Sequence, residues 1–218
     1  MPRLILASAS PRRRELLGSL GIEFEVVVPE VDEVREGMDP EALVIENASR
    51  KARAGWELAG AGEGDVAVGV DTEVFLEGRA LGKAVREEEA RARLQALSGR
   101  THEVLSGVAL ATAKPVEVPR DSREEPLSLT TGAARSLVTF RALDEPTLNA
   151  YLASGEWRDR AGAYAIQGLG SVLVERLEGD FANVVGLPLQ LLLELVPDRF
   201  PAISSGSAGM PENPGSSV

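Results

Sequence analysis

The sequence predicts an α/β protein built around a mixed β-sheet. Short apolar segments typical of buried strands alternate with segments typical of helices, and strand signals then cluster further along the chain. The chain has 218 residues, of which 44% are hydrophobic, so it is long enough to bury one good core. We therefore place a single domain at residues 1–200. Residues 201–218 are rich in Ser, Gly and Pro, and we expect a disordered tail there.

The first elements follow from local start and stop signals. Leu4–Ala7 is typical of a short buried strand. Ser10 and Pro11 then predict a helix, with Ser10 as the N-cap and Pro11 at the first helical position, and Gly21 ends it. The same kinds of signal predict strands at residues 24–28 and 66–70, helices at 39–59 and 85–97, and a hairpin at 74–81.

The second half of the chain carries more strand signals than the first. Residues 112–132 contain three prolines and several charges, and we expect an extended surface loop there. The remaining elements are predicted as strands at residues 101–110, 134–140 and 171–176, and helices at 145–153 and 188–196.

Composition excludes several classes of function. The formal net charge of −11 argues against a nucleic-acid partner, because phosphate backbones are bound by net basic surfaces. Cysteine is absent, which excludes disulfides, thiol nucleophiles and cysteine-ligated zinc. No segment approaches the roughly 20 apolar residues that span a bilayer, and the apolar run near the N-terminus is too short for a signal peptide. We expect a cytoplasmic protein without a membrane partner.

Lysine is scarce, and its positions are therefore informative. Only three of the 23 basic residues are lysines, namely Lys51, Lys83 and Lys114, and the other twenty are arginines. A lysine kept in so arginine-rich a chain is a candidate for a position that requires a compact ammonium group, although an ordinary surface lysine is the alternative.

Residues 8–13 have the features of an anion site. A strand that leads into a capped helix leaves free backbone N–H groups at the positive end of the helix dipole. Arg12 and Arg13 in the first turn add charge-assisted donors for phosphate oxygens. The alternative is a capped surface helix whose arginines are solvated.

Two further clusters carry candidate chemistry. Asp71 and Thr72 directly follow the apolar residues 66–70, so Asp71 could face a cleft at the end of a buried strand and bind Mg²⁺ or accept a proton from water. Gly82 and Lys83 lie where the hairpin returns, and Lys83 could supply a charge to phosphate. The alternatives are a turn aspartate and a surface lysine beside a turn glycine.

Together these clusters resemble the Maf family of nucleoside triphosphate pyrophosphatases. The resemblance extends in order across residues 4–196 and is carried by eight blocks. They are residues 8–17 (SASPRRRELL), 31–33 (VDE), 51–52 (KA), 71–72 (DT), 81–83 (LGK), 97–102 (LSGRTH), 161–168 (AGAYAIQG) and 179–188 (GDFANVVGLP).

The resemblance implies an elongated two-lobed structure with an active-site cleft between the lobes. It implies hydrolysis of a nucleoside triphosphate to the monophosphate and pyrophosphate with a divalent cation, Mg²⁺ or Mn²⁺, as in nucleotide house-cleaning. A homodimer is also expected. Carried over by position, Asp71 is the proton acceptor, with Lys51 and Lys83 also catalytic. Phosphate binding falls to Ser8, Arg12 and Arg13, and metal binding to Glu33 and Asp71.

Three positions divide the family by substrate, and this chain has Arg12, Thr72 and Gln167 there. That combination resembles the branch that cleaves dTTP and UTP. The amide of Gln167 can both donate and accept, which matches the O4 and N3–H edge of uracil or thymine. Two alternatives stay open: a pyrophosphatase for 7-methyl-GTP, and a non-catalytic nucleotide-binding regulator of cell division.

The chain departs from the family pattern most clearly at Glu73, where the family normally has an apolar residue. Smaller departures are Val70, Ala84, Ala165 and the length of the 112–132 segment. If the strand continues past Asp71, residues 71 and 73 share a face, and Glu73 would join a metal-dependent acidic cluster. If the chain turns at residues 71–72, Glu73 instead faces solvent.

Overall fold

The computed structural model describes residues 2–113 and 127–197, and a seven-stranded mixed sheet is its main feature. The strand order is β2-β1-β3-β5-β6-β7, with β4 paired to β3 off this path. β1 runs parallel to β2 and β3, and the other pairs are antiparallel. The strands are β1 (Leu4–Ala7), β2 (Glu25–Val27), β3 (Val66–Leu76), β4 (Arg79–Ala80), β5 (Thr101–Ala113), β6 (Leu127–Phe140) and β7 (Val174–Glu178). The α/β prediction is confirmed.

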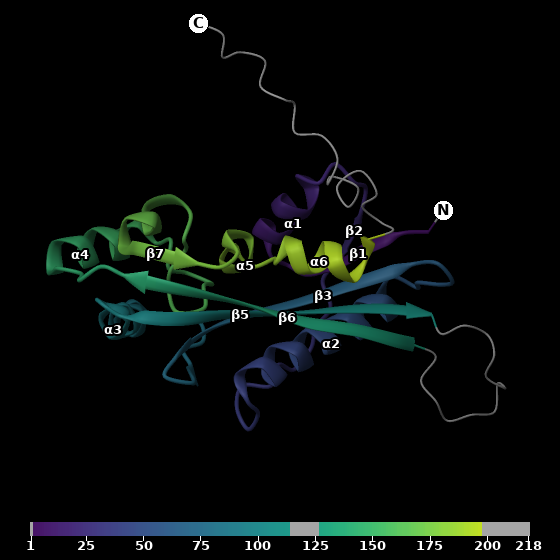
Figure 1. The fold of residues 1–218 in the computed structure, drawn as a ribbon, viewed down its shortest axis with the longest axis horizontal. Helices are drawn as coiled ribbons and strands as arrows, with labels where there is room; N and C mark the ends of the chain where they lie inside the picture. The colour runs from purple at the N-terminus through teal and green to yellow at the C-terminus, as the bar shows by residue number, and fades with distance from the viewer. Residues whose placement is uncertain (1, 114–126, 198–218) are drawn as a thin grey trace, which may run out of the picture.

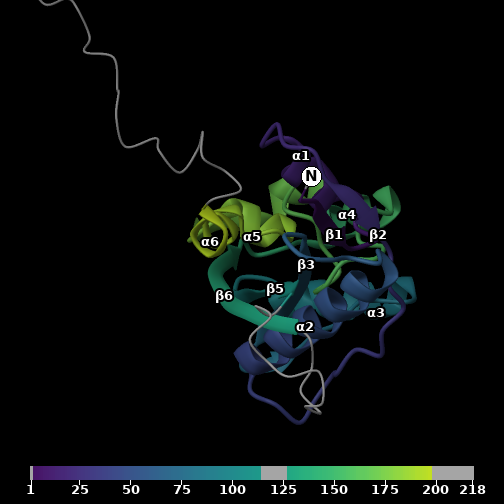
Figure 2. The same ribbon diagram turned by 90° about the vertical axis from the view of Figure 1, so that its right-hand side faces the viewer.

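Helices cover both faces of this sheet. Figures 1 and 2 show α2 on one face and α1, α5 and α6 on the opposite face. The described helices are α1 (Pro11–Gly18), α2 (Pro40–Leu58), α3 (Glu87–Leu97), α4 (Glu145–Ser154), α5 (Phe181–Val185), α6 (Leu189–Leu195) and the 3₁₀ helix η1 (Gly168–Leu173). None of these helices is long and apolar enough to cross a membrane.

The alternation of side chains along β3 decides what packs on each face. Val68 belongs to the core under α1 and α6, whereas Ala67 packs with the apolar residues of α2. Two glycines let α2 lie very close to the sheet. A Cβ at Gly69 would be 2.1 Å from the carbonyl oxygen of Ala48, and a Cβ at Gly107 would be 2.2 Å from that of Val44. Helix α2 is therefore seated directly on the backbone of β3 and β5.

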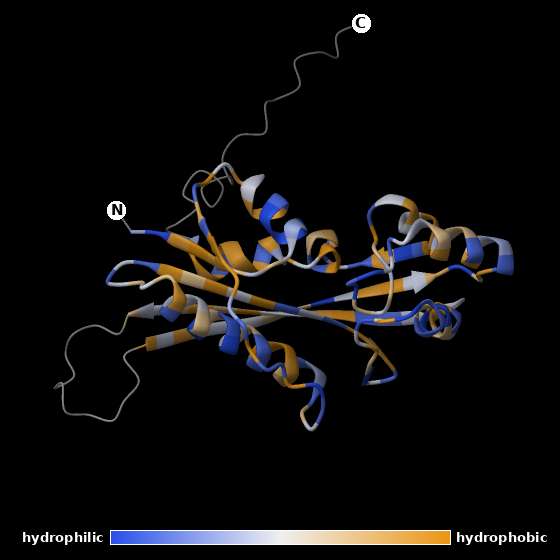
Figure 3. Cartoon of the chain, turned by 180° about the vertical axis from the view of Figure 1, so that it is seen from behind, coloured by the Kyte–Doolittle hydropathy of each residue, from blue (hydrophilic) through white to orange (hydrophobic). Residues whose placement is uncertain are grey.

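The sheet is long, and the molecule is elongated with two lobes (Figure 1). The α1–α2 lobe contains β1, β2, α1, α2 and α6, and its core includes Leu17 and Val68. The α3–α4 lobe contains α3, α4, η1 and β7, and its core includes Tyr151 and Trp157. Strands β3 and β5 contribute buried residues to the cores of both lobes. Strand β6 contributes Val138 and Phe140 to the core of the α3–α4 lobe, and its Leu127 and Leu129 pack on the α2 side of the other lobe. Figure 3 shows apolar stretches along these strands.

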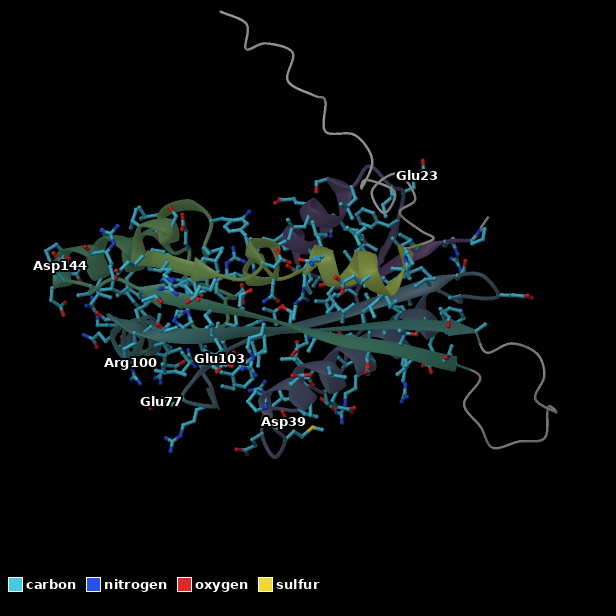
Figure 4. The ribbon with its side chains drawn as sticks, in the orientation of Figure 1. Glu23, Asp39, Glu77, Arg100, Glu103 and Asp144 are labelled. Atoms are coloured by element: carbon cyan, nitrogen blue, oxygen red, sulfur yellow. The ribbon has the colours of Figure 1, made fainter. Side chains whose placement is uncertain are left out.

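The hairpin prediction at residues 74–81 is confirmed. β3 and β4 pair antiparallel, and the turn at Glu77 and Gly78 has positive φ angles of 52° and 75°. Glu77 forms an ion pair with Arg100 at the start of β5, and Figure 4 shows these two side chains near each other on the lower side of the α3–α4 lobe. This contact joins the hairpin turn to the neighbouring strand.

Three sequence predictions about the elements were wrong. Asp71 does not end a strand, because β3 continues to Leu76. The loop expected at 112–132 is wrong at both ends, since residues 112–113 belong to β5 and 127–132 to β6, and residues 114–126 lie outside the described part of the chain. At 127–131, alternating Leu and Ser/Thr side chains suit a half-exposed strand. The strand predicted at 171–176 begins only at Val174, because residues 168–173 form η1.

Other predictions fall outside the described residues or were incomplete. Lys114 and the tail at residues 201–218 lie outside the described part of the chain. Helix α5 was not predicted, because five residues are too few to show a helical period. The boundaries of β1, α2 and α4 agree with the prediction within about one residue.

Candidate active site

A cleft of about 980 Å³ lies on the surface where the two lobes meet. Its volume is at the upper end of the range usual for small-molecule sites. The lining comes from the β1–α1 junction, the loop after β2, helix α2, the middle of β3, the end of β4 with the segment after it, one residue of β5, and two segments near the C-terminal end. These contribute, in order, residues 7–13, residues within 28–35, Leu43, Asn47 and Lys51, residues 71–74, residues 80–83 with Val85, Val104, residues within 159–167, and residues 184–186.

On the α2 side of the cleft, Asp71 is held by two side chains of α2. Lys51 Nζ lies 2.6 Å from Asp71 Oδ1 and 2.6 Å from Glu33 Oε1, and Asn47 Nδ2 donates to Asp71 Oδ2 at 3.2 Å. Asn47 also exchanges two hydrogen bonds with the backbone of Val34, so it fixes the loop that carries Glu33. We call Glu33, Asn47, Lys51 and Asp71 the paired wall, because each charge there has an opposite partner.

The carboxylates of the paired wall fit a divalent cation only in part. Glu33 and Asp71 offer the hard oxygen ligands that Mg²⁺ prefers, and Mg²⁺ is usually held by one or two carboxylates together with substrate phosphates. Their ion pairs to Lys51 already neutralise one oxygen of each. Within the described residues, no group of three or more His, Asp or Glu side chains is arranged to hold a metal ion. A cation here would need phosphate oxygens as additional ligands.

The N-terminus of α1 adds two arginines with different surroundings. Arg13 is fully engaged: its Nε donates to Gly186 O at 2.7 Å, and its other nitrogens donate to Ser8 Oγ at 3.2 Å and Thr72 Oγ1 at 3.1 Å. Burial lowers the pKa of Arg13, and the nearby carboxylates oppose that shift. Arg12 donates through Nε to Val185 O, but one of its buried terminal nitrogens has no partner. Arg12 therefore keeps a donor available.

Two predicted features of this region turned out differently in detail. Ser10 is the N-cap residue, as expected, but its side chain makes no capping bond, and its N–H instead donates to Ser8 Oγ at 3.2 Å. The hydroxyl of Thr72 is shared with Ser106 Oγ at 2.8 Å and with Arg13. Thr72 therefore belongs to a network beneath the cleft as well as to its lining.

The opposite side of the cleft is built from two segments that meet in a short bridge. The backbones of Lys83 and Ala161 form an isolated antiparallel β-bridge, and Gly162 N donates to Gly82 O at 3.0 Å. Arg160 and the exposed Gln167 also line the cleft here. No hydrogen bond or ion pair joins the side chains of Lys83, Arg160 or Gln167 to another residue in the described ranges. We call Lys83, Arg160 and Gln167 the open wall.

Glu73 lies on the same face of β3 as Asp71, so of the two alternatives the strand that continues past Asp71 is confirmed and the turn at residues 71–72 is excluded. One oxygen of Glu73 accepts from Val74 N at 2.8 Å and from Gly82 N at 3.1 Å, at the point where the hairpin opens. Burial raises the pKa of Glu73 to about 7, the two backbone N–H groups oppose the shift, and the charges of Asp71 and Glu33 add to it.

His102 is a buried residue of the α3–α4 lobe. Its Nε2 lies 2.8 Å from Tyr164 Oη, and its ring packs edge-on against Phe140 and Tyr164. Burial lowers the pKa of His102 to about 4, so the ring is neutral at pH 7.

Sequence reasoning did not single out Asn47 or Arg160. Asn47 lies one helical turn before Lys51, and a polar residue at that spacing on the buried face of α2 is a signal that could have found it. Arg160 directly precedes a family block, but it carries no local pattern that distinguishes it from the many other arginines.

The fold and the cleft define a class: an α/β protein whose cleft gathers an aspartate, two lysines and several arginines, which suits a phosphorylated small molecule. The sequence matches the family described as Maf-like protein over residues 3–198. That match covers most of the chain, which therefore belongs to the Maf family.

Curated relatives match this chain over most of its length and most of their own. A protein of Moorella thermoacetica named dTTP/UTP pyrophosphatase is 48% identical over 90% of this chain and 94% of its own. Proteins of the same name from Deinococcus radiodurans and Methylococcus capsulatus are 44% and 48% identical. These matches cover 89% and 86% of this chain, and 92% and 86% of the relatives.

Proposed function

We propose that this protein hydrolyses nucleoside triphosphates, with dTTP and UTP as substrates, to the monophosphate and pyrophosphate. The observation that carries the proposal is the placement of Asp71, which Lys51 and Asn47 hold in a cleft whose other side presents unpaired cations. The dTTP/UTP pyrophosphatase names of relatives that match nearly end to end support the same reaction.

In this reaction a water oxygen bonds to the α-phosphorus while the bond from that phosphorus to the pyrophosphate oxygen breaks. Asp71 takes the proton that the water loses, and Lys51 and Asn47 keep its carboxylate in place. Such hydrolysis depends mainly on positioning and on neutralising oxygen charge. The α1 N-terminus with Ser8 and Arg12 serves one side of the phosphate chain, and Lys83 serves the other.

A divalent cation, Mg²⁺ or Mn²⁺, completes the proposal. Glu33 and Asp71 would hold it together with phosphate oxygens, through the carboxylate oxygens that Lys51 does not use. When bound, it would neutralise negative charge on the phosphates.

Substrate choice is assigned to Arg12, Thr72 and Gln167. Gln167 is exposed at the cleft and can present its amide to the O4 and N3–H edge of a pyrimidine. Arg12 has an unused buried donor, whereas the hydroxyl of Thr72 is engaged by Arg13 and Ser106. We therefore assign Thr72 an indirect role, through the position of Arg13.

Neither alternative function has a specific observation in its favour. A 7-methyl-GTP pyrophosphatase would need another residue set at the three specificity positions. A protein that only binds nucleotides has no need of an aspartate held as Asp71 is. A homodimer in solution and a location in the cytoplasm stay predictions.

Replacing Asp71 by Asn tests the proposal directly. Asn keeps the size of the side chain but cannot accept the proton, so kcat for UTP should fall about 10²- to 10⁴-fold. The assay supplies Mg²⁺ and a panel of triphosphates, and identifies monophosphate and pyrophosphate as products. Near-normal kcat in the variant would remove Asp71 from its role, and no turnover of any nucleotide by the wild type would favour the regulator.

A further inference from the structure

The segment at residues 159–163 is held in a strained conformation at the edge of the cleft. Asp159 and Ala163 have positive φ angles of 55° and 61°, and they are two of only three such non-glycine residues in the described ranges. Each conformation costs free energy that the surroundings must supply. Gly162 lies so close to Val74 that its missing Cβ would be 3.0 Å from the side chain there. The backbone bridge between Lys83 and Ala161 and the hydrogen bond from Gly162 N to Gly82 O hold the segment, including Arg160, against residues 82–83.

The guanidinium of Arg160 has no counter-charge in this position. Its Nε is buried without a hydrogen-bond partner, and no carboxylate of the described residues forms an ion pair with it. Burial lowers the pKa of Arg160, and no nearby carboxylate offsets that effect. A partly buried cation without a partner costs stability in the free protein.

Arg158, two residues earlier, is an arginine of the same segment whose guanidinium does have a partner within the protein. Its guanidinium lies 4.4 Å from the ring centre of Trp157, in a cation–π contact, and it does not line the cleft. Arg158 and Arg160 therefore carry the same charge in the same segment, but only Arg160 faces the cleft unpaired.

We propose that Arg160 is a substrate-binding residue that contacts phosphate oxygens of the bound nucleotide from the open wall. Lys83 is bridged to the residue next to Arg160, so two unpaired cations line the same side of the cleft. Neither cation forms an ion pair with a described residue, although Asp159 also lines the cleft beside Arg160. Two cations so placed suit a multiply charged anion, and a guanidinium matches the geometry of phosphate oxygens. This assignment rests on the proposed function.

The test compares Arg160→Met, Arg160→Lys and the control Arg158→Met with the wild type. Met keeps much of the length of Arg without its charge. In Arg160→Met, KM for UTP should rise about 10- to 100-fold, the range expected when a hydrogen bond to a charged group is lost. The inhibition constant of inorganic pyrophosphate should rise in parallel. Arg160→Lys should recover part of both, and Arg158→Met should change neither.

Melting temperatures separate binding from a structural role. Without ligand, Arg160→Met should melt no lower than the wild type, because it removes an unpaired charge, and its rise in Tm with UTP should be smaller. A ligand-free Tm several degrees lower, with normal KM, would overturn the proposal. So would a raised KM with unchanged pyrophosphate inhibition, which would place Arg160 at the nucleoside. If the wild type cleaves no triphosphate, the proposed function fails, and pyrophosphate binding still tests Arg160.

Discussion

The two walls of the cleft differ in how their charges are balanced. On the paired wall, Lys51 bridges Glu33 and Asp71, so the geometry around Asp71 is fixed before any ligand arrives. On the open wall, Lys83 and Arg160 have no carboxylate partner among the described residues. Paired charges hold a catalytic group in place, whereas unpaired charges are available to bind an oppositely charged ligand. The first wall should therefore matter for folding and catalysis, and the second mainly for binding.

Replacing each cleft lysine by alanine is the most direct test of this difference between the two walls. Lys51→Ala and Lys83→Ala should both lower activity, by about 100-fold or more, because Lys51 holds Asp71 in place and Lys83 supplies positive charge to the phosphates. Only Lys51→Ala should also lower the free energy of unfolding, by about 1–3 kcal/mol, since it leaves two carboxylates without their partner. Activity assays and chemical denaturation of both variants check this.

The result would count against the comparison if the two variants lost equal stability. Lys51→Met is the matched control, because it keeps the buried aliphatic stem while removing the ammonium group. Lys114→Ala, outside the described residues and outside the family blocks, should leave activity unchanged.

Measuring the free energy of unfolding against pH tests whether the α3–α4 lobe, rather than the paired wall, limits stability in acid. His102 has a pKa of about 4 in the folded protein and near its ordinary value of about 6.5 when unfolded. The unfolded chain therefore binds more protons between these values, and stability should fall as the pH drops from about 6.5 to 4. The loss should be on the order of 3 kcal/mol.

His102→Gln supplies the comparison, because Gln keeps a polar partner for Tyr164 but does not titrate. Between about pH 6.5 and 4, the unfolding free energy of the wild type should fall relative to that of the Gln variant by this amount. Parallel curves would assign the acid sensitivity to carboxylates such as those paired with Lys51.

Glu73, between the two walls, should give the smallest effect. Its oxygen accepts two backbone N–H groups, one of them from Gly82 beside Lys83. Glu73→Gln keeps an acceptor and should retain nearly full activity, whereas Glu73→Val should lower kcat a few-fold by leaving both donors unpaired. Activity titrated against Mg²⁺ should give superimposable curves for the wild type and the Gln variant. A shift of the Gln curve would instead support the metal-dependent acidic cluster.

The sequence predicted elements wherever local signals were strong. The buried run of β1, the Asp39-Pro40 start of α2 and the Glu77-Gly78 turn were all found from composition and caps. The end of β3 was misplaced because Asp71 and Glu73 resemble turn residues, and their partners come from elsewhere in the fold: Asn47 of α2 for Asp71, and the backbone of Val74 and Gly82 for Glu73. Tertiary contacts decide such cases.

The candidate site was predictable as a set of residues but not as an arrangement. Motif blocks brought Asp71, Lys51 and Glu33 together as candidates, yet no pattern showed that Lys51 bridges the two carboxylates. Arg12 and Arg13 are neighbours in sequence with the same side chain, but only the fold shows that Arg13 is fully engaged while Arg12 keeps a free donor.

The three long strands that run through both lobes have a consequence for folding. β3 and β5 provide core side chains to each lobe, and β6 pairs with β5 along its length and packs against the cores of both, so neither lobe has a sheet of its own. If the α3–α4 lobe opened, the same strands would lose support where they carry Asp71 and receive α2. We therefore expect the lobes to melt in one cooperative transition, and the cleft to exist only while both cores are intact.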